Sequence, residues 1–117
     1  MKSLTLFLFT MLTSLFNLFG QTSNADLQTA VNEGAFLVDV RSPQEFAEGH
    51  VKGSVNIPLD RVAAQLDKFK GHENIVVFCR SGARSSQAKS ILERNGCANV
   101  INGGTWQAVN QCVKAKP

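Results

Sequence analysis

Residues 74–92 read N-I-V-V-F-C-R-S-G-A-R-S-S-Q-A-K-S-I-L, and this stretch decides the fold. It opens with β-branched and aromatic residues at 75–78, the composition of a strand buried on both faces. After a short loop, Ala88, Ile91 and Leu92 recur at helical spacing up to Gly96. We therefore predict a strand, a tight loop and a helix, with Cys79 at the carboxyl end of the strand, where open α/β sheets bind their ligands.

The loop after this strand favours the thiolate form of Cys79, which is the nucleophilic form of a cysteine. Unpaired N–H groups of the loop and of the helix start would face the sulfur, and the helix dipole adds positive potential there. Arg80 and Arg84 add two cations, and Gly82 permits a tight turn. These features predict a small anion-binding site with a thiolate at its floor. The alternative is a buried structural thiol flanked by solvated surface arginines.

The segments on either side alternate between helix and strand patterns. We predict helices over residues 24–32, 43–48, 60–69 and 105–111, strands over 36–40, 55–57 and 99–101, and a turn at Gly103-Gly104. Ser42 begins a capping box that Glu45 closes, with Pro43 at the first helical position. Arg41 lies close enough to Glu45 to pair with it. The alternation implies an α/β fold, a small and mostly parallel central sheet with helices on both faces.

Composition limits the functions that this chain could have. Its 117 residues are one domain's worth, and 44% of them are hydrophobic, enough for a single core. A net charge of +3, scattered along the chain, gives no argument for nucleic acid binding. His50 and His72 are the only histidines and neither has a partner at metal-ligand spacing, so we predict no metal site.

The first twenty residues differ from all that follow. Lys2 precedes an uncharged run rich in Leu and Phe, and Gly20 closes the run before a polar segment. We interpret residues 1–20 as a secretory signal peptide and residues 21–117 as the mature domain, and we expect an exported protein, periplasmic or secreted. No membrane span should remain after cleavage. The alternatives are an uncleaved membrane anchor and a buried first helix.

The loop Cys79-Arg80-Ser81-Gly82-Ala83-Arg84-Ser85 resembles the active-site loop of rhodanese-type sulfurtransferases. The similarity covers about residues 26–109. Upstream it includes D-V-R-S-P-Q-E-F at 39–46, E-G-H-V-K-G-S at 48–54 and V-N-I-P at 55–58. Downstream it includes Asn99-Val100, Gly103-Gly104 and Trp106. Motifs of this length in this order are far more specific than a lone Cys-x-x-Gly.

The resemblance implies a single-domain sulfurtransferase with the rhodanese-like fold. Cys79 would be the catalytic residue, taking the outer sulfur of a small anionic donor such as thiosulfate as a persulfide and passing it to cyanide, a thiol or a protein thiol. Arg80, Ser81, Gly82, Ala83, Arg84 and Ser85 would bind the donor and the outer sulfur, and Asp39 and Arg41 would support the site. The resemblance implies no cofactor, and we expect a monomer.

Two other functions stay open. A persulfide carrier, or a non-catalytic rhodanese module that binds a redox partner, would have the same fold. Related phosphatases and arsenate reductases use the same kind of loop, but those phosphatases have five residues between nucleophile and arginine, whereas four separate Cys79 from Arg84 here. The shorter loop favours a single sulfur over a phosphoryl group.

The other two cysteines, Cys97 and Cys112, flank the last predicted strand and helix. Export to an oxidising compartment would permit a disulfide between them, which would leave Cys79 free. The alternative is a pair of buried, unpaired thiols.

Overall fold

The computed structural model describes residues 24–117, and the predicted signal peptide lies outside the described residues. Four strands alternate with helices along this part of the chain. In chain order the elements are α2 (Asn24–Asn32), β1 (Phe36–Asp39), α3 (Pro43–Glu48), β2 (Val55–Asn56), α4 (Leu59–Val62), the 3-10 helix η1 (Ala63–Lys68), β3 (Ile75–Cys79), α5 (Ala83–Arg94), β4 (Val100–Thr105) and α6 (Trp106–Lys114).

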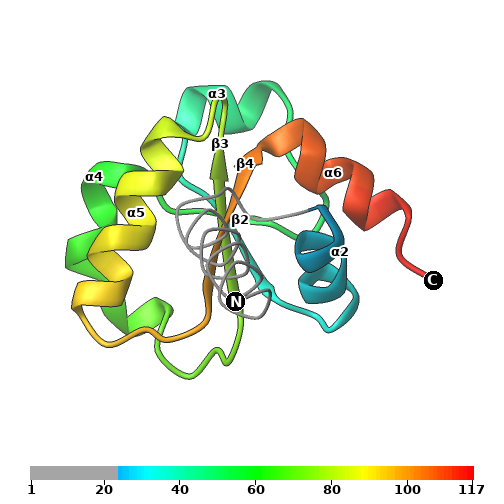
Figure 1. The fold of residues 1–117 in the computed structure, drawn as a ribbon. Coiled ribbons are helices and arrows are strands. Elements are labelled where there is room, and N and C mark those ends of the chain that lie inside the picture. Colours follow the sequence, from blue (N-terminus) through cyan, green and yellow to red (C-terminus); the bar gives the residue numbers. More distant parts are fainter. Residues whose placement is uncertain (1–23) are drawn as a thin grey trace, which may run out of the picture.

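The four strands form one parallel sheet in the order β2-β1-β3-β4. Figure 1 shows α4 and α5 on one face of this sheet and α2 and α6 on the other. Helix α3 lies beyond the end to which the β3 arrow points, so it borders the carboxyl ends of the strands. This arrangement confirms the predicted α/β fold with helices on both faces. It also brings the residues that follow β1, β3 and β4 to the same edge of the sheet.

Strand β3 divides its side chains between two hydrophobic clusters, because successive side chains of a strand point to opposite faces. Ile75, Val77 and Cys79 belong to the cluster under α4 and α5, whereas Val76 and Phe78 belong to the cluster under α2 and α6. All five are buried. A strand covered on both faces explains why its sequence is continuously apolar rather than alternating.

Three secondary-structure predictions need correction. The expected helix over residues 60–69 is broken into α4 and η1, with non-helical φ and ψ at Gln65. Strand β4 continues through Gly103 and Gly104, which were expected to form a turn, and ends at Thr105. Helix α6 extends to Lys114, beyond the expected end at residue 111, with the Thr105 hydroxyl accepting a hydrogen bond from the Ala108 amide.

A bulge explains why the Gly-Gly pair stays in the strand. Val77 is opposite Asn102 and Phe78 is opposite Gly104, so Gly103 is an extra residue in β4. A Cβ on Gly103 would lie 2.8 Å from Cγ2 of Val109 and 2.9 Å from Cγ1 of Val76. Glycine is therefore required here for close packing between β4, β3 and α6.

The disulfide that the sequence left possible between Cys97 and Cys112 is not formed, and both thiols are free. Cys97 packs against the cluster under α4 and α5, whereas Cys112 belongs to the cluster on the opposite face. The sheet lies between the two clusters, so the two sulfurs are held apart. Burial raises the pKa of the Cys112 thiol.

Candidate functional site

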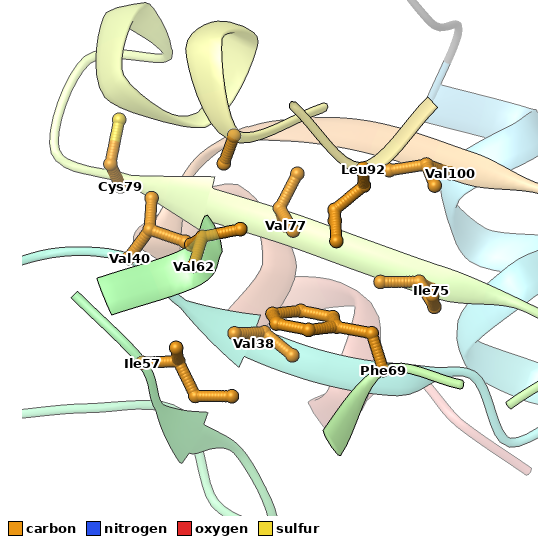
Figure 2. Packing of buried hydrophobic residues seen from close by; sticks show 11 residues of the cluster. Val38, Val40, Ile57, Val62, Phe69, Ile75, Val77, Cys79, Leu92 and Val100 are labelled. Atoms are coloured by element: carbon orange, nitrogen blue, oxygen red, sulfur yellow. The ribbon is translucent and has the colours of Figure 1, made fainter. Parts of the chain in front are cut away.

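Cys79 ends β3 and begins the loop that leads to α5. Figure 2 shows its sulfur beyond Val77, pointing towards the start of α5. The residue is fully buried, yet the sulfur meets polar groups: the Gly82 amide donates a hydrogen bond to Sγ over 3.0 Å, and Ser85 Oγ lies 3.4 Å from Sγ. Gly82 has φ +97°, the left-handed conformation that favours glycine. The loop therefore folds its amides towards the sulfur, as the sequence predicted.

Opposing effects set the acidity of this thiol. Burial disfavours the charged form, but a hydrogen bond between the Cys79 sulfur and the Ser85 hydroxyl, together with hydrogen bonds from the amides of Ser85, Ser81 and Gly82, outweighs it. Together they hold the pKa of Cys79 below its ordinary value. A thiol with this environment is suited to nucleophilic chemistry, because more of it is ionised at neutral pH.

Arg84 is held by Glu45. Its Nη1 donates to Oε1 of Glu45 over 2.7 Å and its Nη2 donates to Oε2 over 3.1 Å. This bidentate ion pair connects α5 to α3. The hydrogen bond from Arg84, followed by one from the Ser42 backbone, lowers the pKa of Glu45 to about 2. The same contact raises the pKa of Arg84. Glu45 also closes the predicted capping box with Ser42.

The prediction that Arg41 pairs with Glu45 was wrong, because Arg41 pairs with Asp39 instead. Nη2 of Arg41 lies 2.6 Å from Oδ2 of Asp39, and both side chains are buried. Arg41 also donates to the Gly49 carbonyl over 2.8 Å, and its guanidinium lies 4.8 Å from the centre of the Trp106 ring. This buried cation thus joins the end of β1, the end of α3 and the start of α6. The expectation that Asp39 and Arg41 support the architecture of the site stays a prediction.

Arg80 is the exposed cation beside Cys79. The structure gives it no ion-pair partner within residues 24–117. It lines a surface hollow of about 350 Å³. The other residues of this hollow are Arg41, Glu45, Glu48, Gly49, Trp106 and Gln107. Of the two loop arginines, Arg80 is therefore the one available to a bound anion without breaking an existing contact.

Asn102 is a site residue that the sequence reasoning missed. Its Oδ1 accepts hydrogen bonds from the Ser85 hydroxyl at 2.7 Å and from the Gly104 amide at 2.9 Å. Its Nδ2 donates to the Gly82 carbonyl over 3.2 Å. Asn102 thus joins β4 to both groups that touch the Cys79 sulfur. A polar residue directly before a Gly-Gly pair, near the carboxyl end of a strand, is the signal that could have identified it.

Ser81 and Ala83 are exposed at the rim of the loop, and Ser85 is buried in the first turn of α5. The structure therefore brings the predicted loop residues, Asp39 and Arg41 to one edge of the sheet. His50 lies apart from the sulfur's contacts, stacking on Phe46 with Nδ1 2.9 Å from the Phe46 carbonyl oxygen. Within residues 24–117, no group of three or more His, Cys, Asp or Glu side chains is placed to hold a metal ion.

A profile of the Rhodanese-like domain matches residues 23–109. The chain belongs to the rhodanese-like domain family. Among similar proteins, the thiosulfate sulfurtransferase PspE of Escherichia coli is 38% identical over 69 residues, which cover 57% of this chain and 66% of that protein. A sulfurtransferase of Allochromatium vinosum is 34% identical over 73 residues, covering 62% of this chain and 68% of that protein.

Solved structures agree with this assignment. The human single-domain sulfurtransferase TSTD1 superimposes with a TM-score of 0.64 at 27% identity, covering 75% of this chain and 92% of that chain. Relatives of this rhodanese-like chain thus include proteins that transfer sulfur. In the described part of the chain, no helix has both the length and the apolar character needed to cross a membrane.

Proposed function

We propose that this protein is a sulfurtransferase that moves sulfane sulfur from a small anionic donor such as thiosulfate to a thiol or cyanide acceptor, through a persulfide on Cys79. One observation carries the proposal above all: the Cys79 sulfur receives the Gly82 N–H at 3.0 Å at the floor of a loop whose amides lower its pKa. Sulfurtransferase relatives in sequence, and the similar fold of a human single-domain sulfurtransferase, support it.

The reaction has two displacement steps. In the first, the Cys79 thiolate attacks the outer sulfur of thiosulfate, a new S–S bond forms, and the old S–S bond breaks with its electron pair leaving on sulfite. In the second, an acceptor thiolate or cyanide attacks the outer sulfur of the persulfide, and the electron pair of that S–S bond returns to Cys79. No net change in the protein results.

Charge decides how the donor is held. Thiosulfate and the departing sulfite are both anions, and the exposed Arg80 lies directly beside Cys79. Arg84 adds positive potential near the sulfur, but both Nη atoms of its guanidinium already donate hydrogen bonds to Glu45. We therefore assign donor binding mainly to Arg80, with Arg84 holding the loop against α3. This refines the expectation from the sequence that Arg80 and Arg84 both bind the donor.

Intact-mass measurement tests the first step. The wild-type protein, treated with thiosulfate and freed of excess reagent, should gain one sulfur atom, and cyanide should then remove it as thiocyanate. Cys79→Ser should gain none, while Cys97→Ser and Cys112→Ser serve as matched controls that retain the gain. Absence of a Cys79-dependent adduct, both with thiosulfate and with a 3-mercapto-2-oxo acid, would refute the proposal.

Two outcomes would redirect the assignment. A protein that accepts one sulfur but makes no steady-state thiocyanate would be a persulfide carrier or a partner-binding module. Hydrolysis of an aryl phosphate or reduction of arsenate, present in wild type and lost in Cys79→Ser, would favour oxyanion chemistry.

We also propose that the protein is exported, because residues 1–20 have the composition of a secretory signal peptide. Expression of the full chain in a bacterium should give a mature protein in the periplasm or medium that begins at Gln21. A cell-retained protein that still begins at Met1 would contradict this.

A further inference from the structure

The orientation of the Asn102 side chain is fixed by two backbone groups. The Gly104 N–H points at one end of the amide and the Gly82 carbonyl at the other. An N–H needs an acceptor and a carbonyl needs a donor, so the first end must be Oδ1 and the second Nδ2. The neighbour of Ser85 Oγ at 2.7 Å is therefore an oxygen that can only accept.

This orientation decides where the Ser85 proton lies. Because Oδ1 only accepts, the Ser85 hydroxyl donates its single proton to Asn102 and turns its lone pairs towards Cys79. In that state Ser85 accepts a hydrogen bond from a Cys79 thiol and gives none to a thiolate. When Cys79 ionises, a stabilising hydrogen bond from Ser85 requires the hydroxyl to turn away from Asn102. Oδ1 then keeps the Gly104 N–H, so the turn leaves no oxygen of Asn102 without a donor.

We propose that Asn102 is a positioning residue that competes with the Cys79 sulfur for the Ser85 hydroxyl proton, and so sets how readily the sulfur becomes a nucleophile. The inference rests on the proposed function only in taking Cys79 as the reactive thiol. The same competition operates after each transfer, when sulfur leaves and a thiolate is regenerated. Asn102 does not touch the sulfur; it acts through Ser85, and through Gly82 by holding the loop carbonyl.

Charged groups around the Cys79 loop lie on several elements and must be kept constant in a test. They are Arg80 in the loop, Arg84 on α5, Asp39 and Arg41 at the end of β1, and Glu45 on α3. Asn102 itself is neutral, so its replacement by an apolar residue leaves all of these charges unchanged. A shift of the Cys79 titration in such a variant would report hydrogen bonding and loop position rather than a lost charge.

The test is the pH dependence of Cys79 alkylation by iodoacetamide, followed by peptide mass spectrometry without any sulfur donor. In Asn102→Ala the Ser85 hydroxyl loses its competing acceptor, so the pH midpoint of Cys79 alkylation should fall. We expect this fall to be about 0.5 to 1 pH unit larger in the protein that keeps Ser85 than in a Ser85→Ala background. Asn102→Leu, closer to asparagine in size, should show the same difference and serves if the alanine variant folds poorly. Ser86→Ala, the exposed neighbouring serine, controls for hydroxyl loss on α5.

The comparison between backgrounds separates the proposed role from a structural one. Loosening of the loop carbonyl at Gly82 would move the midpoint equally with and without the Ser85 hydroxyl. Equal shifts in the two backgrounds, or no shift in either, would overturn the inference. Sulfur transfer is not part of this readout, so failure of the sulfurtransferase proposal and failure of the Asn102 inference give different results.

Discussion

Glu45→Gln isolates the ion pair that ties α3 to α5. Glutamine keeps the Oε1 that accepts hydrogen bonds from the Ser42 backbone at 3.1 Å and from the Ser42 hydroxyl at 3.0 Å, so the helix cap survives. What is lost is the negative charge opposite Arg84, together with the Oε2 atom that accepts a hydrogen bond from Arg84 Nη2. The substitution therefore measures the ion pair with little disturbance of α3.

The magnitude follows from the Glu45 pKa and its exposure. A fall from 4.5 to about 2 would correspond to about 3 kcal/mol of stability if the pair were shielded from water, at about 1.4 kcal/mol per pKa unit. The side chains of Arg84 and Glu45 are 36% and 28% exposed, so solvent screens the pair. We expect about 1 kcal/mol at pH 7. Because the folded-state pKa is lowered, this contribution is complete above about pH 4.5 and disappears as pH falls towards 2.

Urea unfolding at pH 7 and pH 3 is the assay, since urea adds no ionic strength. The free energy of unfolding of Glu45→Gln should lie about 1 kcal/mol below wild type at pH 7, with less than half of that difference left at pH 3. Glu48→Gln, on the same helix and without an ion-pair partner in the described chain, is the matched control. A deficit equal to that of Glu48→Gln, or one unchanged between the two pH values, would refute the reasoning.

Two further predictions concern the donor and the bulge. Arg80→Gln should raise KM for thiosulfate roughly tenfold with a smaller change in kcat, because it removes the exposed cation beside Cys79. Arg94→Gln, at the far end of α5, is the control and should leave the steady-state kinetics unchanged. A larger effect on KM from Arg84→Gln than from Arg80→Gln would contradict the assignment. Gly103→Ala should lower the free energy of unfolding by about 1 to 3 kcal/mol, since its Cβ would collide with buried methyl groups of Val76 and Val109. Adding Val109→Ala removes one collision, so the double variant measured by urea unfolding should lose less than the sum of the two single losses, and simple additivity would count against the collision.

Features that depend on nearby residues were predictable from sequence. The capping box at Ser42 needs only a spacing of three residues, and its two hydrogen bonds are both present. The strand, loop and helix around Cys79 follow from a continuous apolar run, a glycine and a helical repeat. Gly82 adopts a left-handed conformation in the tight loop, and its amide points at the Cys79 sulfur.

Features that depend on which strands are neighbours could not be predicted. Glu45 meets Arg84 only because parallel β1 and β3 bring α3 beside the start of α5. Cys97 precedes β4 and Cys112 lies in α6, the next helix along the chain, but the two cysteines pack on opposite faces of the sheet.

The sequence by itself therefore determined the order of the elements and the position of Cys79 at the end of β3, because both follow from short-range periodicity and turn chemistry. The tertiary structure decided which of the two loop arginines has an ion-pair partner within residues 24–117, and it placed Asn102 of β4 within 2.7 Å of Ser85 on α5. The physical reason is that hydrogen bonds and ion pairs form between atoms a few ångströms apart in space, and the strand order, which no local pattern encodes, sets those distances.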